Sequence, residues 1–260
     1  MELKMHYDPL KDKLAVYVEL FPAFRNLFYF MLDVLLLRQR YIKREINRYF
    51  DDGFSFFDAG AGFCQYSDYI LTKYPAATVR AVDLKTDYLR NYASVAGNRF
   101  LYSYADLQEY IPPEKYDMAV AIDILEHIQN DNAVLRNLHN SLKDKGVLII
   151  STPSDLDEAA KFTSEHVRPG YNKKKLEEKL ISNGFKILSS VYSYGFWGAI
   201  SWKLLIKFPL TLYNRNKIFA LLLPIYYAIV FVPAQIMMLL DLAFYNPQGT
   251  GIIITARKKH

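Results

Sequence analysis

Acidic residues and glycines recur where short apolar runs of this 260-residue chain end. The first group, Asp58–Gly62, combines an aspartate with two glycines, which let a backbone approach a ligand closely and supply amide donors. Later runs end at Asp83, at Asp106 and in the segment Asp123–His127. Because ligands of parallel sheets bind outside the carboxyl ends of the strands, these groups are expected to surround one ligand.

The glycine loop differs from a dinucleotide-binding loop. Such a loop reads Gly-x-Gly-x-x-Gly to hold a pyrophosphate, whereas Gln65 stands three places after Gly62. The acid before the glycines favours a cationic ligand, and S-adenosylmethionine carries a sulfonium and an ammonium group and no phosphate. Asp58 is expected to attract its aminoacyl end, Asp83 to accept the ribose hydroxyls, and Asp106 to accept the adenine amino group.

Short apolar runs alternate with longer periodic stretches, and these are the elements that must position the acids. The short runs predict strands buried on both faces. Helices are predicted over 64–73, 85–96, 130–142 and 171–183, with Leu135, Leu138 and Leu142 on one face of the third and Gly184 capping the fourth. The alternation predicts an α/β fold with a doubly wound sheet and right-handed crossovers.

The chain resembles the class I S-adenosylmethionine-dependent methyltransferases through FFDAGAGFCQYSDYI, RAVDL, YADLQEY, YDMAVAIDILEHI and LKDKGVLIISTPS. The likeness is greatest to the branch with the ubiquinone-biosynthesis O-methyltransferases, and it covers residues 40–193 and the last strand. It implies a Rossmann-like seven-stranded sheet of order 3-2-1-4-5-7-6. It also implies that the cofactor is bound by Asp58, Gly60, Gly62, Asp83, Leu84, Asp106, Leu107 and Asp123. The family often has a third glycine where this chain has Cys64.

The segment Asp123–His127 bears on the reaction. Enzymes that methylate base amines often carry Asn/Asp-Pro-Pro-aromatic here, and its absence disfavours base N-methylation. His127 is a candidate catalytic base for a hydroxyl, since histidine titrates near neutral pH, or it anchors the following helix. His166 is a second candidate, beside Arg168, for contact with the methyl acceptor, or it caps the 171–183 helix.

A divalent metal is a further possibility that the resemblance raises. Some relatives with Glu-x-x-Glu-His and a later histidine bind the acceptor hydroxyls through a metal. The corresponding set in this chain is Asp123, Glu126, His127 and His166. Asp123 is a shorter residue than the glutamate of those relatives, so the metal is left undecided.

Aromatic and apolar residues crowd two flanks of the chain. Residues 1–50 are expected to form an amphipathic helical cap, broken near Pro22. Residues 195–248 are expected to be an apolar helical insertion between the last two strands. The S-adenosylmethionine-binding domain then comprises residues 51–194 and 249–260.

Within the insertion, Ile218–Leu240 contains no charged residue and is long enough to span a membrane. It is preceded by Trp197, Trp202, Lys203, Lys207, Arg215 and Lys217, which are typical of a membrane interface. One crossing would separate the last two strands, so we expect the insertion to dip into one leaflet. The alternatives are an apolar lid over the active site and a dimer interface, and the oligomeric state is left open.

These observations predict an S-adenosylmethionine-dependent O-methyltransferase that acts on a lipid, quinone, polyene or phenol at a membrane surface. The single cysteine and the charged N-terminus favour the cytoplasmic face of the membrane, with peripheral or monotopic attachment. The net charge of +5 permits a nucleic-acid partner, but the basic residues lie beside apolar stripes, which disfavours one. The alternatives are a soluble small-molecule methyltransferase, a nucleic-acid methyltransferase and a non-catalytic cofactor-binding scaffold.

Overall fold

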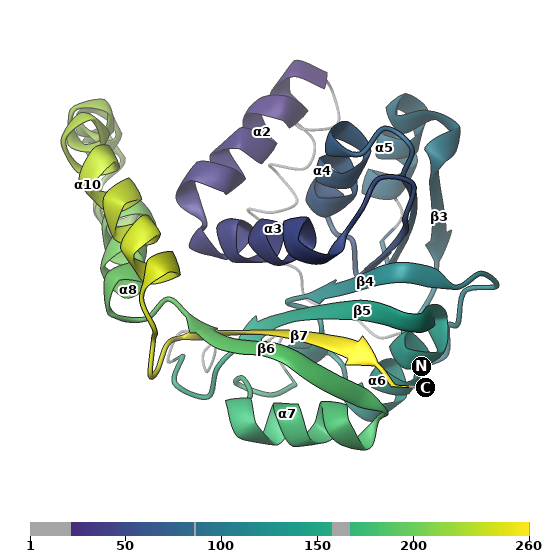
Figure 1. Cartoon of the computed structure of the whole chain (residues 1–260). Helices are drawn as coiled ribbons and strands as arrows, with labels where there is room; N and C mark the ends of the chain where they lie inside the picture. The colour runs from purple at the N-terminus through teal and green to yellow at the C-terminus, as the bar shows by residue number, and fades with distance from the viewer. Residues whose placement is uncertain (1–21, 86, 158–166, 260) are drawn as a thin grey trace.

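The computed structural model of the chain describes residues 22–85, 87–157 and 167–259. Its centre is a seven-stranded sheet of order β3-β2-β1-β4-β5-β7-β6, as predicted (Figure 1). β7 is antiparallel to both of its neighbours, and the other neighbouring strands are parallel. The strands are β1 (Ser55–Ala59), β2 (Thr78–Asp83), β3 (Phe100–Tyr104), β4 (Tyr116–Ile122), β5 (Leu142–Pro153), β6 (Phe185–Ser193) and β7 (Gly251–Lys258).

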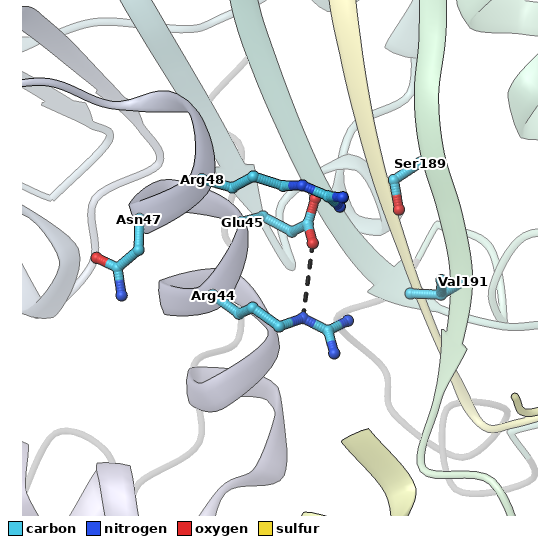
Figure 2. Close-up of a pocket in the computed structure, with 6 residues that line it drawn as sticks. All are labelled: Arg44, Glu45, Asn47, Arg48, Ser189 and Val191. Carbon is cyan, nitrogen blue, oxygen red and sulfur yellow. Dashed lines mark ion pairs between the residues drawn. The ribbon is translucent and has the colours of Figure 1, made fainter. Parts of the chain in front are cut away.

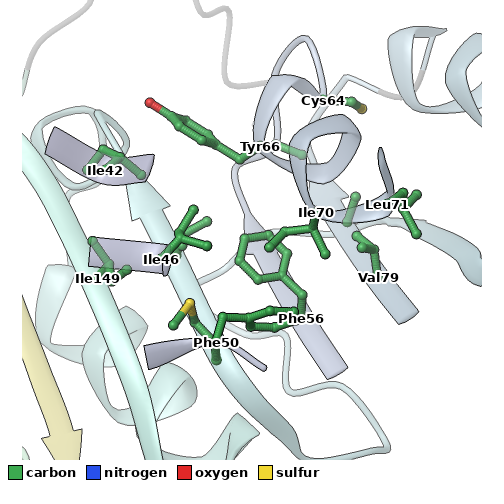
Figure 3. Packing of buried hydrophobic residues seen from close by; sticks show 14 of the residues in the cluster. Ile42, Ile46, Phe50, Phe56, Cys64, Tyr66, Ile70, Leu71, Val79 and Ile149 are labelled. Carbon is green, nitrogen blue, oxygen red and sulfur yellow. The ribbon is translucent and has the colours of Figure 1, made fainter. Parts of the chain in front are cut away.

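Helices cover both faces of the sheet because the central strands are apolar on both sides. Phe56 and Phe57 are neighbours in β1, yet they belong to two different buried clusters, since successive strand residues face opposite sides. Figure 3 shows Ile42, Ile46 and Phe56 in the first cluster. This face carries α3 (Leu37–Tyr49), α4 (Gln65–Lys73) and α5 (Asp87–Ala96), and the other carries α6 (Asp131–Ser141) and α7 (Lys173–Ser182).

The helices lie close to their predicted ranges, with one correction. Leu142 was expected on the apolar face of the third helix, but α6 ends at Ser141 and Leu142 opens β5. Its side chain is still buried in the same cluster as Leu135, so its apolar character serves the core from the strand. Gly184 follows α7 with a left-handed backbone (φ +86°), as a helix C-terminal cap requires.

The described part of the N-terminal cap consists of α2 (Pro22–Leu35) and α3, which are separated by a break at Leu36. The break expected near Pro22 would adjoin residues 1–21, which lie outside the described residues. Leu36 has an extended backbone (φ −110°, ψ 106°), which redirects the chain so that Leu37 enters the core. The Tyr29 hydroxyl on α2 donates to the carbonyl of Phe63 at 2.5 Å. The cap therefore contacts the glycine loop directly through this hydrogen bond.

The insertion is a helical hairpin that projects from the end of the sheet where β6 stops (Figure 1). Its outgoing arm comprises α8 (Phe196–Trp202), the π-helical η4 (Lys203–Lys207) and α9 (Phe208–Arg215). The returning arm comprises the 3₁₀-helical η5 (Lys217–Leu222) and α10 (Leu223–Ala243), which continues through Pro233.

A buried carboxylate fixes the base of this hairpin. Asp241 on α10 accepts hydrogen bonds from the Tyr41 hydroxyl (2.8 Å) and from the Gly198 amide (2.9 Å). The Asn246 amide donates to the same carboxylate at 3.1 Å. α10, α8 and α3 are thereby joined at one point.

Candidate functional site

The loop after β1 has the backbone of a ligand-binding glycine loop. Gly60 (φ +80°) and Gly62 (φ +51°) are both left-handed, and the amides of Gly60 and Ala61 donate to the Val82 carbonyl at 2.8 and 3.1 Å. A Cβ on Gly60 would come within 2.8 Å of Ile124, so the loop packs closely there. A Cβ on Gly62 would meet no atom within 4 Å, so the open side of the loop lies at Gly62.

Cys64 occupies the position where the third glycine of the family often stands. Its backbone is left-handed (φ 60°, ψ 20°), a conformation that glycine adopts more easily than any other residue. The side chain is fully buried, and burial raises the pKa of the thiol well above its usual value. Cys64 is therefore a structural residue, since a reactive cysteine needs exposure and a lowered pKa.

Two of the predicted cofactor acids lie side by side at the ends of β1 and β2. Asp58 is buried and accepts a hydrogen bond from the Ser67 hydroxyl at 2.6 Å, and burial raises its pKa to about 6. Asp83 accepts from the amides of Gly62 (2.9 Å) and Lys85 (3.0 Å). Each carboxylate oxygen has a second lone pair, so Asp83 retains acceptors for a ligand hydroxyl while it holds the glycine loop.

The third acid lies beyond β3, in the turn that follows it. One Asp106 oxygen accepts from the Gln108 amide at 2.9 Å, and the Gln108 side chain donates to the same carboxylate. Leu107 is buried, and its carbonyl accepts from the Asn137 side chain at 3.0 Å. Leu84, after β2, is half-buried. The predicted acids thus stand in order along the carboxyl edge of adjacent strands.

Asp123, after β4, is paired with a residue that was not predicted to belong to the site. Its backbone is left-handed (φ +50°), and its carboxylate accepts from the Ser151 hydroxyl at 2.9 Å. The other carboxylate oxygen forms an ion pair with the guanidinium of Arg38 on α3. Basic residues crowd this flank, so no sequence signal distinguished Arg38 from Arg40 or Arg44.

Several polar atoms on α3 and on the first turn of α4 are buried without a hydrogen-bond partner within the described part of the chain. They are Nε of Arg38, both amide atoms of Gln39 and Oε1 of Gln65, whereas the buried Tyr66 hydroxyl lies within reach of the Arg38 guanidinium. Burial raises the pKa of Tyr66 to about 12, and the nearby charge of Arg38 partly opposes this shift. Buried polar groups without partners cost free energy, so these groups are candidates for contact with a polar ligand.

Gln65 and Tyr66 form the first turn of α4, directly after the glycine loop. A ligand bound along this edge would meet acids on one side and the Arg38 cation on the other. The residues therefore fit S-adenosylmethionine, whose amino-acid end carries both an ammonium group and a carboxylate. Its ribose would lie at Asp83, where a carboxylate suits two hydroxyls.

Glu126 stands out among the residues near the acceptor side. It is buried on the 3₁₀ turn η2 (Leu125–His127), and the Thr152 hydroxyl donates to its carboxylate at 3.2 Å. Burial raises the pKa of Glu126 to about 7, while the charges of Arg38 and Arg168 oppose the rise. From the sequence, Glu126 was predicted only as a metal ligand. His127 is half-buried on the same turn.

Arg168, predicted to contact the methyl acceptor, instead forms hydrogen bonds within the protein. Its guanidinium donates to the carbonyls of Leu125 (2.7 Å) and Gln129 (3.1 Å) and to the Tyr171 hydroxyl (2.7 Å). Arg168 therefore holds the η2 turn in place. His166 lies outside the described residues.

The metal set is not assembled by the residues that the structure describes. Within residues 22–85, 87–157 and 167–259, no three His, Cys, Asp or Glu side chains come close enough to hold a metal ion. Asp123 is paired with Arg38, and Glu126 with Thr152. Asp123, Glu126 and His127 alone thus form no metal centre.

A shallow groove of about 600 Å³ lies elsewhere, between α3 and β6 (Figure 2). It is lined by Arg44, Glu45, Asn47, Arg48, Ser189 and Val191. Oε1 of Glu45 lies 3.7 Å from Nε of Arg44. The other carboxylate oxygen of Glu45 accepts a hydrogen bond from the Thr255 hydroxyl at 2.8 Å, which joins α3 to β7. None of the predicted cofactor residues lines this groove, so it is separate from the candidate site.

Residues 57–148 match the family of proteins described as the methyltransferase domain. A curated relative, malonyl-[acyl-carrier protein] O-methyltransferase 2 of Ilyobacter polytropus, is 25% identical over 170 residues. The match covers 61% of this chain and 66% of that protein, just under two thirds of its length.

Solved structures share the fold over most of the chain. A chain from the complex between the Haloferax volcanii Trm112 methyltransferase activator and a methyltransferase aligns with a TM-score of 0.63 at 11% identity, covering 98% of this chain and 99% of that one. Phosphoethanolamine N-methyltransferase 2 of Haemonchus contortus, in complex with S-adenosyl-L-methionine, aligns with a TM-score of 0.57 at 19% identity, covering 83% and 51%. At these identities the likeness establishes the fold.

Proposed function

We propose that the chain is a class I S-adenosylmethionine-dependent methyltransferase that O-methylates a lipophilic small molecule at a membrane surface. One observation carries the finer part of this proposal. The apolar hairpin begins at Gly195, directly after β6, at the same edge of the sheet as the cofactor acids. An acceptor held in lipid would therefore meet the protein close to the methyl donor.

The proposed cofactor contacts follow from charge and position. S-adenosylmethionine supplies an electrophilic methyl group on its sulfonium. Asp83 accepts from the ribose hydroxyls, and Asp58 attracts the ammonium group, while Arg38 binds the carboxylate beside Tyr66. Asp106 and Leu107 contact the adenine. The cap formed by α2 and α3 excludes water from this edge, which favours transfer to the acceptor over hydrolysis.

An acceptor hydroxyl must lose its proton to the enzyme as the methyl group is transferred. We propose His127 as the base, because histidine titrates near neutral pH, and His166 as a second contact. Glu126 is a further candidate for the same role. Its raised pKa of about 7 suits a catalytic base, and it shares the η2 turn with His127.

Two exposed apolar surfaces favour membrane contact over an apolar lid. The stretch Lys217–Ala243 is long and apolar enough to cross a membrane, yet only 6% of its most apolar window is buried. A lid folded over the active site would bury that surface. α2 also exposes apolar side chains, namely Phe24, Leu27, Phe30 and Met31. Such patches are typical of interaction surfaces.

O-methylation is favoured by the segment after β4 and by the relative from Ilyobacter polytropus, whose name is that of an O-methyltransferase. The acceptor of that protein is not carried over, because the match spans less than two thirds of its length.

The proposed function is tested by comparing lipid extracts from cells with and without the protein by mass spectrometry. We expect a lipophilic species that is lighter by one methyl group in the cells that lack it. If all differences lie in the aqueous fraction, the acceptor is water-soluble and the proposal is wrong. Base hydrolysis and fragmentation of the product would distinguish methyl esters and ethers from methylamines.

A further inference from the structure

The two arms of the hairpin, residues 196–215 and 217–243, pack against each other along their length. Ser201, Leu205 and Pro209 of the outgoing arm are buried, and so are Ala234 and Met238 of the returning arm. The hydroxyls of Tyr226 and Tyr227 donate to the carbonyls of Leu204 and Leu205, both at 2.8 Å. Each arm is therefore left with one outer face.

The outer face of the returning arm is a continuous aliphatic stripe. Its members are between 52% and 68% exposed: Ile218, Leu222, Ile225, Ile229, Val232, Ile236 and Leu239. They follow one another at alternating spacings of four and three residues, which places the members on α10 in one row along the helix, preceded by Ile218 and Leu222 on η5. No charged residue lies between Ile218 and Leu240.

The outer face of the outgoing arm carries lysines among apolar residues, since Phe196 and Leu210 are exposed at the same helical spacing. Lys203 and Lys207 are exposed and lie one helical turn apart, two positions from the buried Leu205 in either direction, so they point away from the returning arm. The turn between the arms carries exposed Arg215 and Lys217. The only acid of the hairpin, Asp241, is buried at its base. The hairpin is thus a two-layered slab with one aliphatic side and one side on which all its exposed cations stand, among apolar residues.

We infer that this slab lies in the plane of one leaflet of an anionic membrane, with the aliphatic stripe among the acyl chains and the lysines at the headgroups. This inference rests on the proposed function and specifies how the enzyme meets the membrane. The four exposed cations, without an exposed acid, complement anionic headgroups. In this orientation, parallel to the membrane, both sides of the slab contact the lipid, as in other interfacial amphipathic structures.

A spanning hairpin would use the same residues poorly. Lys207 precedes Arg215 by eight residues, which corresponds to roughly 12 Å along a helix. If Arg215 reached the far headgroups, Lys207 would stand near the middle of a hydrocarbon core about 30 Å thick. A charged side chain is strongly disfavoured at that depth.

A second copy of the chain also fits the stripe poorly. Helices that pair through such spacings carry charged residues beside the stripe to set the partner and register. Here the neighbouring positions are apolar as well, and Leu221 is 76% exposed. A protein interface would have a polar rim.

Site-directed nitroxide labels measure the depth of each labelled residue in the membrane, and hence the orientation of the hairpin. Leu222→Cys, Ile229→Cys and Ile236→Cys are labelled one at a time on vesicles of phosphatidylcholine with phosphatidylglycerol. The natural chain is the blank, because its one cysteine, Cys64, is buried. We expect equal depths for the three labels and a headgroup depth for Lys207→Cys. Depths that change by about 10 Å from one label to the next would show a spanning hairpin and overturn the inference.

Vesicle flotation gives the second readout. Ile229→Lys and the double variant Lys203→Gln/Lys207→Gln should bind these vesicles at least tenfold more weakly than the natural chain. Val95→Lys, at a residue 50% exposed on α5, is the matched control and should bind normally. Unchanged binding of both hairpin variants, or a dimer in solution that Ile229→Lys dissolves, would overturn the inference.

The inference and the proposed function fail in different ways. Methylation of an extracted lipid in detergent does not require the hairpin to lie in a leaflet, so the hairpin variants should retain this activity. A protein that methylates such a lipid in detergent but does not bind vesicles would refute the inferred membrane orientation alone. A protein that binds vesicles in plane but methylates only water-soluble acceptors would refute the proposed function alone.

Discussion

The guanidinium of Arg38, at the start of α3, forms an ion pair with the carboxylate of Asp123, at the end of β4. This contact joins the N-terminal cap to the carboxyl edge of the sheet. Nε of Arg38 is buried there without a partner among the described residues, and the Tyr66 hydroxyl lies beside the same guanidinium. The ion pair thus marks the place where the cap and the cofactor's carboxylate are proposed to meet.

Arg38→Met should weaken S-adenosylmethionine binding by about ten- to a hundredfold, because hydrogen bonds to charged groups contribute roughly 1.5–3 kcal/mol. Titration calorimetry measures this change. Arg48→Met is the matched control, since Arg48 is exposed on the same helix. Equal affinities of the two variants would remove Arg38 from the cofactor site.

Asp83→Asn should reduce cofactor affinity at least tenfold, because an amide accepts hydrogen bonds from the ribose hydroxyls more weakly than a carboxylate. Asp87→Asn, at an exposed acid in the first turn of α5, should bind normally. Calorimetry with S-adenosylhomocysteine isolates binding from turnover. Normal affinity of Asp83→Asn would contradict the assignment of the ribose site.

The sheet and the strand-end acids could be predicted because their signals are local. A short apolar run that ends in an acid, such as the one before Asp58 or Asp83, specifies both a buried strand and a polar group at its end. Resemblance then supplied the strand order. The interruption between α2 and α3 at Leu36 could not be predicted, because Val34–Leu37 is uniformly apolar. Only tertiary packing selects which leucine turns inward.

Cys64→Gly should change the free energy of unfolding by less than about 1 kcal/mol, because relief of the left-handed backbone offsets the loss of a small buried side chain. Cys64→Val should destabilise the protein by more than about 2 kcal/mol, since a β-branched residue is poorly tolerated at φ 60°. Urea unfolding compares the two. A strongly destabilised glycine variant would show that the thiol, rather than the backbone, determines this position.

Glu126→Gln should alter the pH dependence of stability. In the natural chain the folded protein holds a proton on Glu126 up to a pKa of about 7, whereas the unfolded chain releases it near the ordinary glutamate pKa of 4.5. The free energy of unfolding therefore falls as pH rises between these values, by roughly 3 kcal/mol from this residue. The variant should lack this component.

Urea unfolding at several pH values measures both proteins, and the contributions of Asp58 and other acids cancel in the comparison. The difference in stability between variant and natural chain should shift in favour of Glu126→Gln as pH rises from 4.5 to 7. A constant difference across this range would mean that Glu126 is ionised throughout, and it would weaken its candidacy as a base.

Arg38, Tyr66 and Glu126 were not assigned these roles from the sequence, because their importance depends on distant partners. Arg38 is one of several arginines on its flank, and only the fold places it against Asp123. The burial of Glu126 likewise arises from packing beside Thr152 on β5. The hairpin's apolar run was visible in the sequence, but the opposition of its two faces required the packing of its arms.

The most direct test of the central claim is the transfer of a labelled methyl group. Purified protein is incubated with methyl-labelled S-adenosylmethionine and a detergent-solubilised lipid extract, and the organic phase is counted. We expect label in a lipophilic product, and none with Asp83→Ala. Label that remains entirely in the aqueous phase, although the natural protein binds the cofactor, would contradict the account.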